Sequence, residues 1–217
     1  MSSAPVAPFT SRHVQLVRAL MAAAAAAMVT FSSDKSYVVG LTVFSGFVVT
    51  TALVLAVAAF LVDDRTRRPG FLLLAGFDLV TGIVASIQPL RSVLLLFVLL
   101  IVWAAATGIA EFFVGFADRR AGRDRPLARD AMFVGVLGVV LAVAVAFVSP
   151  DYTLDYFIKE AGQTFTLSGQ IIMVGLFGGY TAILAVYLAI AGFTPRHVEP
   201  AAEAEIPTAT HHEKDHA

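Results

Sequence analysis

The sequence predicts an all-α, polytopic membrane protein with six transmembrane helices. Of its 217 residues, 58% are apolar and only 14% are charged. The apolar residues gather in about six blocks of roughly 18 to 26 residues, and a helix needs about 20 residues to cross the hydrocarbon core. Residues 93–106 are apolar on every side, whereas barrel strands alternate in polarity over about ten residues. Helices that satisfy their own backbone groups are therefore expected.

Clusters of turn-forming and charged residues separate the blocks. They lie at 32–35, 63–70, 88–89, 118–130 and 149–151, and none interrupts a block. The chain is thus expected to have a cytoplasmic N-terminus at 1–12, a transmembrane domain at 13–193 and a disordered, cytoplasmic tail at 194–217. The predicted spans are residues 13–31, 37–62, 70–87, 92–117, 131–148 and 169–193.

The basic residues predict the orientation. Three of the 15 Lys and Arg residues, Lys35, Arg91 and Lys159, lie in the connections after the first, third and fifth spans. The other twelve lie at the termini, in the connections after the second and fourth spans, or, like Arg18, near the same ends of the spans. Short loops rich in Lys and Arg stay in the cytoplasm, so both termini are expected there. Because the charges are segregated by side, they form no single basic face for nucleic acid. We expect a bacterial inner-membrane protein whose contacts are with lipids.

The first span has two interpretations. Arg12 and Arg18 precede a run of alanines, which suits a weakly hydrophobic anchor. The same pattern also resembles a secretory signal with small residues at a cleavage site. The other five spans are predicted in either case.

The spans also predict a repeat. Three times, a shorter span that leaves the cytoplasmic side (outgoing) is followed by a longer span that comes back to it (returning). This pattern indicates three helical hairpins. Pro89 and Pro150 lie just past the outgoing spans of the second and third units. Residue identity between the units is poor, so the repeat is predicted at the level of architecture.

One segment resembles a known family. Residues 103–113, WAAATGIAEFF, followed by Asp118-Arg119-Arg120, resemble the returning-helix signature of the HdeD-like acid-resistance membrane proteins. Gly76 and Gly82 before Pro89 extend the resemblance, which covers roughly 13–193 as architecture. These are small bacterial inner-membrane proteins of six helices in three hairpins. The first unit departs from the pattern by lacking a matching Gly or Glu. The resemblance implies a role in acid stress and supplies no catalytic residues.

Three charged residues fall inside the predicted spans. Asp78, Glu111 and Arg18 are expected at similar depths, roughly 7 to 12 Å from the cytoplasmic side. Intramembrane charges are costly, about 2.5–3.5 kcal/mol each at a helix centre, so they are expected to meet in a polar cluster. Two carboxyls beside one guanidinium can share and relay a proton. The alternative is an ion pair that only sets helix register.

Small residues predict close helix packing. Gly175 and Gly179 have the GxxxG spacing, and Ala104 with Gly108 repeats the small-xxx-small pattern. These grooves are expected to pack inside the bundle, with an interface to a homo-oligomer or a larger membrane complex as the alternative. The outer connection at 149–168 carries Tyr152, Tyr156 and Phe157. We predict a short interfacial helix there, with both tyrosines on one side, and a ligand site is the alternative.

Composition and motifs also limit the chemistry. The chain has no cysteine, which excludes disulfides and thiolate sites. No phosphate loop, zinc helix or nucleophile elbow is found, so a non-enzymatic protein without cofactor or metal is predicted. Three histidines at 211–216 could bind metal only weakly. Two functions remain open, namely an HdeD-like stress protein that senses protons and an accessory subunit of a larger membrane complex.

Overall fold

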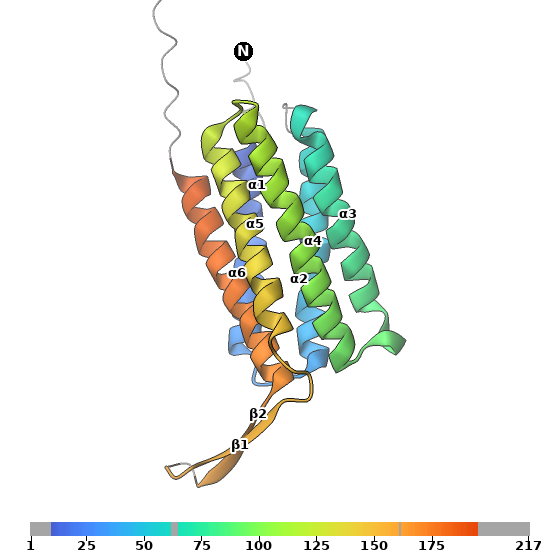
Figure 1. Ribbon diagram of the computed structural model, residues 1–217, viewed down its shortest axis with the longest axis vertical. Helices are drawn as coiled ribbons and strands as arrows, with labels where there is room; N and C mark the ends of the chain where they lie inside the picture. The colour runs from blue at the N-terminus through green and yellow to red at the C-terminus, as the bar shows by residue number, and fades with distance from the viewer. Residues whose placement is uncertain (1–9, 62–64, 161, 195–217) are drawn as a thin grey trace, which may run out of the picture.

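The computed structural model of the chain is a bundle of six long helices (Figure 1), and it describes residues 10–61, 65–160 and 162–194. All six helices are long and apolar enough to cross a membrane, which makes the chain a multi-pass membrane protein. Short 3₁₀ turns, η1 (Arg65–Arg67) and η2 (Gln88–Leu90), flank the third helix. The helices are α1 (Ser11–Phe31), α2 (Tyr37–Leu61), α3 (Arg68–Ser86), α4 (Val93–Arg120), α5 (Arg125–Ala146) and α6 (Gly169–Phe193).

The six predicted helices are confirmed, and their bounds differ most from the predicted spans between α4 and α5. Helix α4 continues to Arg120, and α5 begins at Arg125 rather than at residue 131. Two residues start α5 early. The Asp124 side chain accepts a hydrogen bond from the Leu127 backbone N–H at 3.1 Å, and Pro126 occupies the first turn, where its missing N–H costs nothing. Both helices therefore project further at this end than hydropathy alone indicates.

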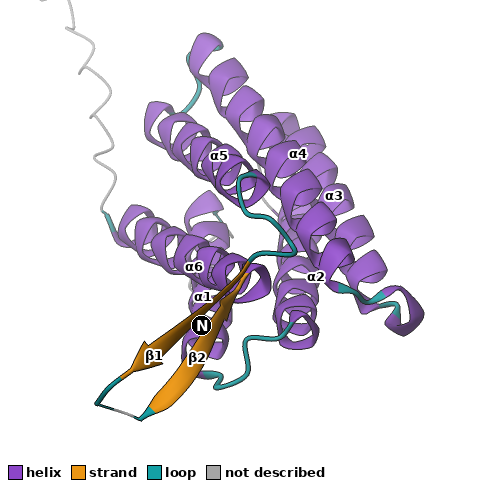
Figure 2. Ribbon diagram, turned by 60° about the horizontal axis from the view of Figure 1, so that its bottom comes forward, coloured by secondary structure: helices purple, strands orange, loops and turns teal. Residues whose placement is uncertain are grey.

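The helices form a closed ring in chain order, as the view along the bundle shows (Figure 2). Each helix packs beside its neighbours in sequence, and α6 packs against α1 to close the ring. The most extensive contacts are α4 with α5, α1 with α6, and α2 with α3. Helices α2 and α3, like α4 and α5, are joined at the arginine-bearing end. The predicted hairpins pair α1 with α2, α3 with α4 and α5 with α6. These pairs pack less extensively, so the predicted repeat is not confirmed.

Glycines permit the close packing of α4 against α5. A Cβ atom on Gly108 would lie 2.7 Å from the Gly135 carbonyl oxygen, and one on Gly115 would lie 2.6 Å from the Ala128 carbonyl oxygen. Contacts this short involve backbone, which cannot move aside as a side chain can. The two helices therefore touch through their main chains, as small-residue motifs allow in membranes.

Aromatic side chains fill the middle of the ring. Trp103 lies edge-on to Phe44, Phe47 and Tyr180, with ring centroids 5.3, 6.0 and 5.9 Å apart. Phe177 packs on the same two phenylalanines. Edge-to-face pairs of this kind add about 0.5–1.5 kcal/mol each beyond the area they bury. The centre of the bundle is thus closed by interlocked rings from α2, α4 and α6.

The outer connection is a β-hairpin and not the predicted helix. Strands β1 (Thr153–Ile158) and β2 (Gln163–Ser168) pair antiparallel and project beyond the end of the bundle (Figures 1 and 2). The expectation of a short helix was wrong because seven of the twelve residues in the two strands are β-branched or aromatic, which suits strands. Tyr156 pairs with Phe165, and their rings stack at 6.1 Å. Phe157 faces the opposite side, because side chains alternate along a strand.

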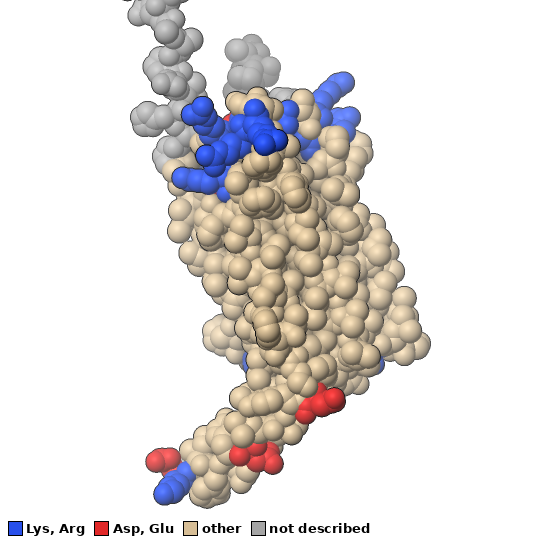
Figure 3. Space-filling model, viewed as in Figure 1, with Lys and Arg blue, Asp and Glu red and all other residues tan. Residues whose placement is uncertain are grey.

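Charge is divided between the two ends of the molecule. Most Lys and Arg side chains gather at one end, and most of the acidic surface visible in Figure 3 lies on and near the hairpin at the other. We call these the arginine end and the hairpin end. The wall between them is apolar over the length of the helices, as a lipid-facing surface requires.

Candidate functional site

The site begins with an ion pair between α1 and α4. Arg18 Nη2 lies 2.6 Å from Glu111 Oε1, and the two side chains are 16% and 8% exposed. Arg18 is on the buried face of the alanine-rich helix, one turn before Ala22, which has no exposed surface. The small alanines bring α1 near its neighbours, so the long guanidinium can reach across to α4. Removing one partner of such a buried pair would leave an uncompensated charge.

Asp78 has a different partner. Its Oδ1 accepts a hydrogen bond from Trp103 Nε1 at 2.6 Å, which joins α3 to α4. Asp78 is 3% exposed, and Trp103 belongs to the central aromatic cluster. Among the described residues, Asp78 forms no ion pair within 4 Å. The carboxyl is thus held by a neutral donor, next to the rings that close the bundle.

A small cavity connects these two pairs. It has a volume of about 20 Å³, and Arg18, Asp78 and Glu111 all line it. Two further polar atoms of this region, Arg18 Nε and Thr51 Oγ1, are buried and have no hydrogen-bond partner within the described part of the chain. A polar cavity of this size is large enough for one water molecule, which would satisfy such groups.

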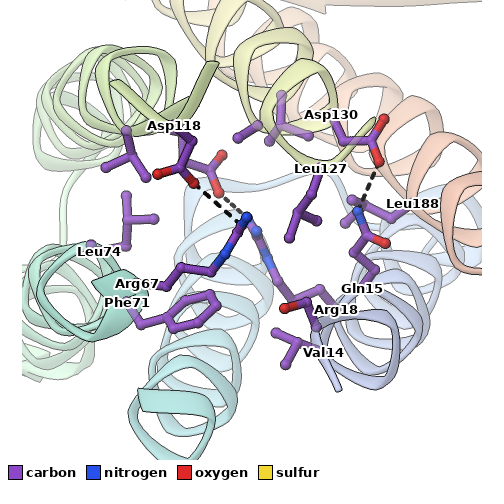
Figure 4. Close-up of a pocket in the computed structure, with 16 residues that line it drawn as sticks. Val14, Gln15, Arg18, Arg67, Phe71, Leu74, Asp118, Leu127, Asp130 and Leu188 are labelled. Carbon is purple, nitrogen blue, oxygen red and sulfur yellow. Dashed lines mark hydrogen bonds and ion pairs between the residues drawn. The ribbon is translucent and has the colours of Figure 1, made fainter. Parts of the chain in front are cut away.

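A second, larger cavity lies toward the arginine end. Its volume is about 70 Å³, and it shares Arg18, Leu74 and Glu111 with the small one. Figure 4 shows Arg18 and Arg67 reaching into this space. Asp118 and Asp130 lie on either side of Leu127, and Leu74 and Phe71 line the side near Arg67. Every helix except α2 contributes lining residues, and Leu188 is the one from α6.

Asp118 forms ion pairs with two arginines at the mouth of this cavity. Arg123 donates to Asp118 Oδ1 through Nε at 2.9 Å and Nη2 at 2.7 Å, and Arg67 Nη1 lies 3.3 Å from Oδ2. Arg123 thus donates through two nitrogens to one carboxylate oxygen, and Arg67 lies at the other oxygen. These contacts tie η1 and the α4–α5 connection to the end of α4.

Asp130, which lines the same cavity from α5, is held by neutral donors. Gln15 Nε2 donates to its Oδ2 and the Tyr187 hydroxyl donates to its Oδ1, both at 3.0 Å. Asp130 is buried and bridges α5 to α1 and α6. The cavity system therefore contains four carboxyl groups, those of Asp78, Glu111, Asp118 and Asp130, in a region where acids are otherwise costly.

The structure brings the predicted cluster together in part. Arg18 and Glu111 form the expected contact, and Asp78 lines the same small cavity but bonds to Trp103. Sequence reasoning missed Asp130 and Gln15. It assigned Asp130 to a loop, although the spacing of Asp130, Val134 and Gly138 places all three on one face of a helix.

The other predicted residues have mixed outcomes. Gly108 packs inside the bundle against Gly135 and Gly138, as expected. Gly175 and Gly179 do not, because nothing lies within 4 Å of a Cβ built on either one. Strand β1, which carries Tyr156 and Phe157 and follows Tyr152, lies beyond the end of the bundle, at the hairpin end (Figure 1). The histidine-rich tail lies outside the described residues, within which no group of three metal-ligating side chains occurs.

The arrangement offers proton chemistry on carboxyl groups, with a guanidinium, an indole and space for water close by. Comparisons of the chain with protein-family models, with curated proteins and with solved structures found no match.

Proposed function

We propose that this chain is a non-enzymatic membrane protein that responds to protons through the buried cluster of Arg18, Asp78 and Glu111. One observation carries the proposal. Two cavities that share Arg18 and Glu111 extend from the arginine end to Asp78. A proton can therefore reach these carboxyls along polar side chains and water rather than through hydrocarbon.

The packing beyond Asp78 supports a sensor rather than a conductor. Phe44, Trp103 and Phe177 interlock there, and Phe44 has no exposed surface. Apolar rings offer no site for a proton to occupy. Protons are thus expected to enter and leave by the arginine end, and each protonation would alter the contacts that α1, α3 and α4 make with one another.

The basic residues support an orientation for this response. Because arginine-rich loops stay in the cytoplasm, we propose that the arginine end faces the cytoplasm of a bacterium, with both termini on that side. The cluster would then respond to acidification of the cytoplasm. This agrees with the resemblance to HdeD-like proteins, and we propose a role in acid stress on that basis.

The polar contacts also favour a non-enzymatic role. Glu111 and Asp118 are each bound to arginine, Asp130 to an amide and a hydroxyl, and Asp78 to an indole. A catalytic carboxyl needs to reach a substrate, and these four instead hold helices together.

Acid survival tests the proposal. In a strain of the source organism that lacks the chain, we expect the wild-type protein to restore survival, and D78N and E111Q to restore it poorly. The control is D151N, which changes an exposed acid outside the helices. Membrane levels of all variants are measured by immunoblot. If D78N and E111Q reach wild-type levels and protect cells as well as D151N does, the proposal is wrong.

One feature favours the accessory-subunit alternative. Gly175 and Gly179 form a small-residue face on α6 that points away from the bundle, where another helix could approach closely. Purification from native membranes in mild detergent tests it. A stoichiometric partner that G175L and G179L release, with the bundle still folded, would support the subunit role.

A further inference from the structure

Three arginines form an open basic hollow on the outer side of the arginine end. Arg119 at the end of α4 and Arg125 and Arg129 at the start of α5 line it together with Pro126. Its volume is about 530 Å³, and the three arginines are exposed. In the described part of the chain, no carboxylate lines the hollow. Figure 3 shows the basic side chains gathered over this end of α4 and α5.

The acidic residues near this hollow bind other groups. Asp118 faces the interior and binds Arg67 and Arg123, and Asp130 faces the interior and binds Gln15. Asp124 caps the first turn of α5. Among the described residues, Arg119, Arg125 and Arg129 form no ion pair within 4 Å, and Arg129 contacts the Tyr187 hydroxyl.

An apolar hollow lies along the same groove, deeper in the membrane region. It is lined only by apolar side chains, has a volume of about 180 Å³, and consists of Ile109, Phe112, Phe113, Val136, Val139 and Val140. Arg119 follows Phe112 by seven residues, and Val136 follows Arg129 by seven. Seven residues are two helical turns, so each pair lies on one helix face about 10 Å apart.

We propose that this outer groove between α4 and α5 binds one anionic phospholipid. The phosphate would lie among Arg119, Arg125 and Arg129, and an acyl chain would follow the apolar hollow between the two helices. The order of the two hollows matches that of a lipid, with charge at the membrane surface and hydrocarbon below it. Basic hollows between helices at a membrane surface suit anionic headgroups, and guanidinium forks suit phosphate oxygens. The inference does not depend on the proton-sensing role.

Native mass spectrometry of the detergent-purified, full-length chain tests the proposal. The probes are phosphatidylglycerol and phosphatidylcholine with identical acyl chains. We expect the protein to retain phosphatidylglycerol preferentially, with one tightly held molecule. The variant R119Q/R125Q should weaken that binding roughly 25-fold, taking about fivefold for each arginine near the surface. Its matched control, R65Q/R120Q, removes two exposed charges from the same end but outside the hollow.

A second variant tests the acyl part of the groove. V136W would fill the apolar hollow and is expected to weaken phosphatidylglycerol binding with all arginines present. I183W adds the same ring to an exposed position on α6 and should not weaken it. Equal retention of the two lipids, equal losses in R119Q/R125Q and R65Q/R120Q, or displacement of the lipid by millimolar inorganic phosphate would each overturn the proposal.

Discussion

Trp103 donates its indole N–H to the carboxylate of Asp78 over 2.6 Å, and both side chains are buried. Trp103 is the single tryptophan of the chain. The contact couples the polar cavity system on one side to the aromatic cluster on the other. It also places a natural fluorophore directly on the deepest acid of the site.

The first prediction uses this fluorophore. The indole N–H becomes a stronger donor in the excited state, so a carboxylate acceptor moves emission to longer wavelength. As the pH falls and Asp78 takes up a proton, we expect Trp103 emission to shift to shorter wavelength in the purified, folded protein. D78N should start at the shorter wavelength and lose the pH response.

A variant at the hairpin end serves as the control for that titration. D151N leaves the cluster unchanged and should show the wild-type response. A pH-dependent shift of the same size in D78N would show that another group causes it, and the coupling of Asp78 to Trp103 would then not explain the signal.

The second prediction concerns the Arg18–Glu111 pair. R18M or E111Q alone should destabilise the folded bundle by about 3–5 kcal/mol, because each leaves a buried charge without its partner. The double variant R18M/E111Q should be more stable than the sum of the two losses indicates. Unfolding in detergent gives all three values. Simple additivity would mean that the two residues do not interact in the folded state.

The third prediction compares two glycines. G108A should lower the free energy of unfolding by about 1–3 kcal/mol, because its Cβ would meet the α5 backbone at 2.7 Å. G175A has nothing within 4 Å and should be neutral or slightly stabilising, since alanine favours the helix. Thermal unfolding of the two variants in the same detergent checks this. Equal effects would contradict the close α4–α5 contact.

The fourth prediction concerns the aromatic cluster. F44A should destabilise the protein by about 3–5 kcal/mol, because it removes a fully buried ring that contacts Trp103 and Phe177. F147A removes a ring that is 87% exposed and should change stability little. In liposomes, a proton leak in F44A but not in F147A would support the closed centre. A leak in the wild-type protein would contradict it.

The fifth prediction tests the orientation. Since the chain contains no cysteine, single cysteines can be introduced without background. A membrane-impermeant maleimide should label K159C, at the tip of the hairpin, in intact cells. It should label A121C, in the α4–α5 connection, only after the cells are opened. Labelling of A121C in intact cells would reverse the proposed topology.

The sequence predicted only part of the residues in the site. Asp78 and Glu111 were found because an acid inside an apolar block is conspicuous. Asp130 was missed because it lies among the charged residues between two blocks, where hydropathy does not separate a buried face from a loop. The role of Trp103 depends on how α3 and α4 are rotated toward each other, which no local pattern states.

The sequence by itself determined six helices and their approximate ends, because a membrane span requires a certain length of apolar chain and that requirement is local. It also determined that most Lys and Arg residues fall on one side of the spans. Only the tertiary structure decided which acid meets which donor, that Gly108 packs inside while Gly175 faces outward, and that α1 closes the ring against α6. These depend on the rotation and order of helices, which are set by packing between residues far apart in the chain.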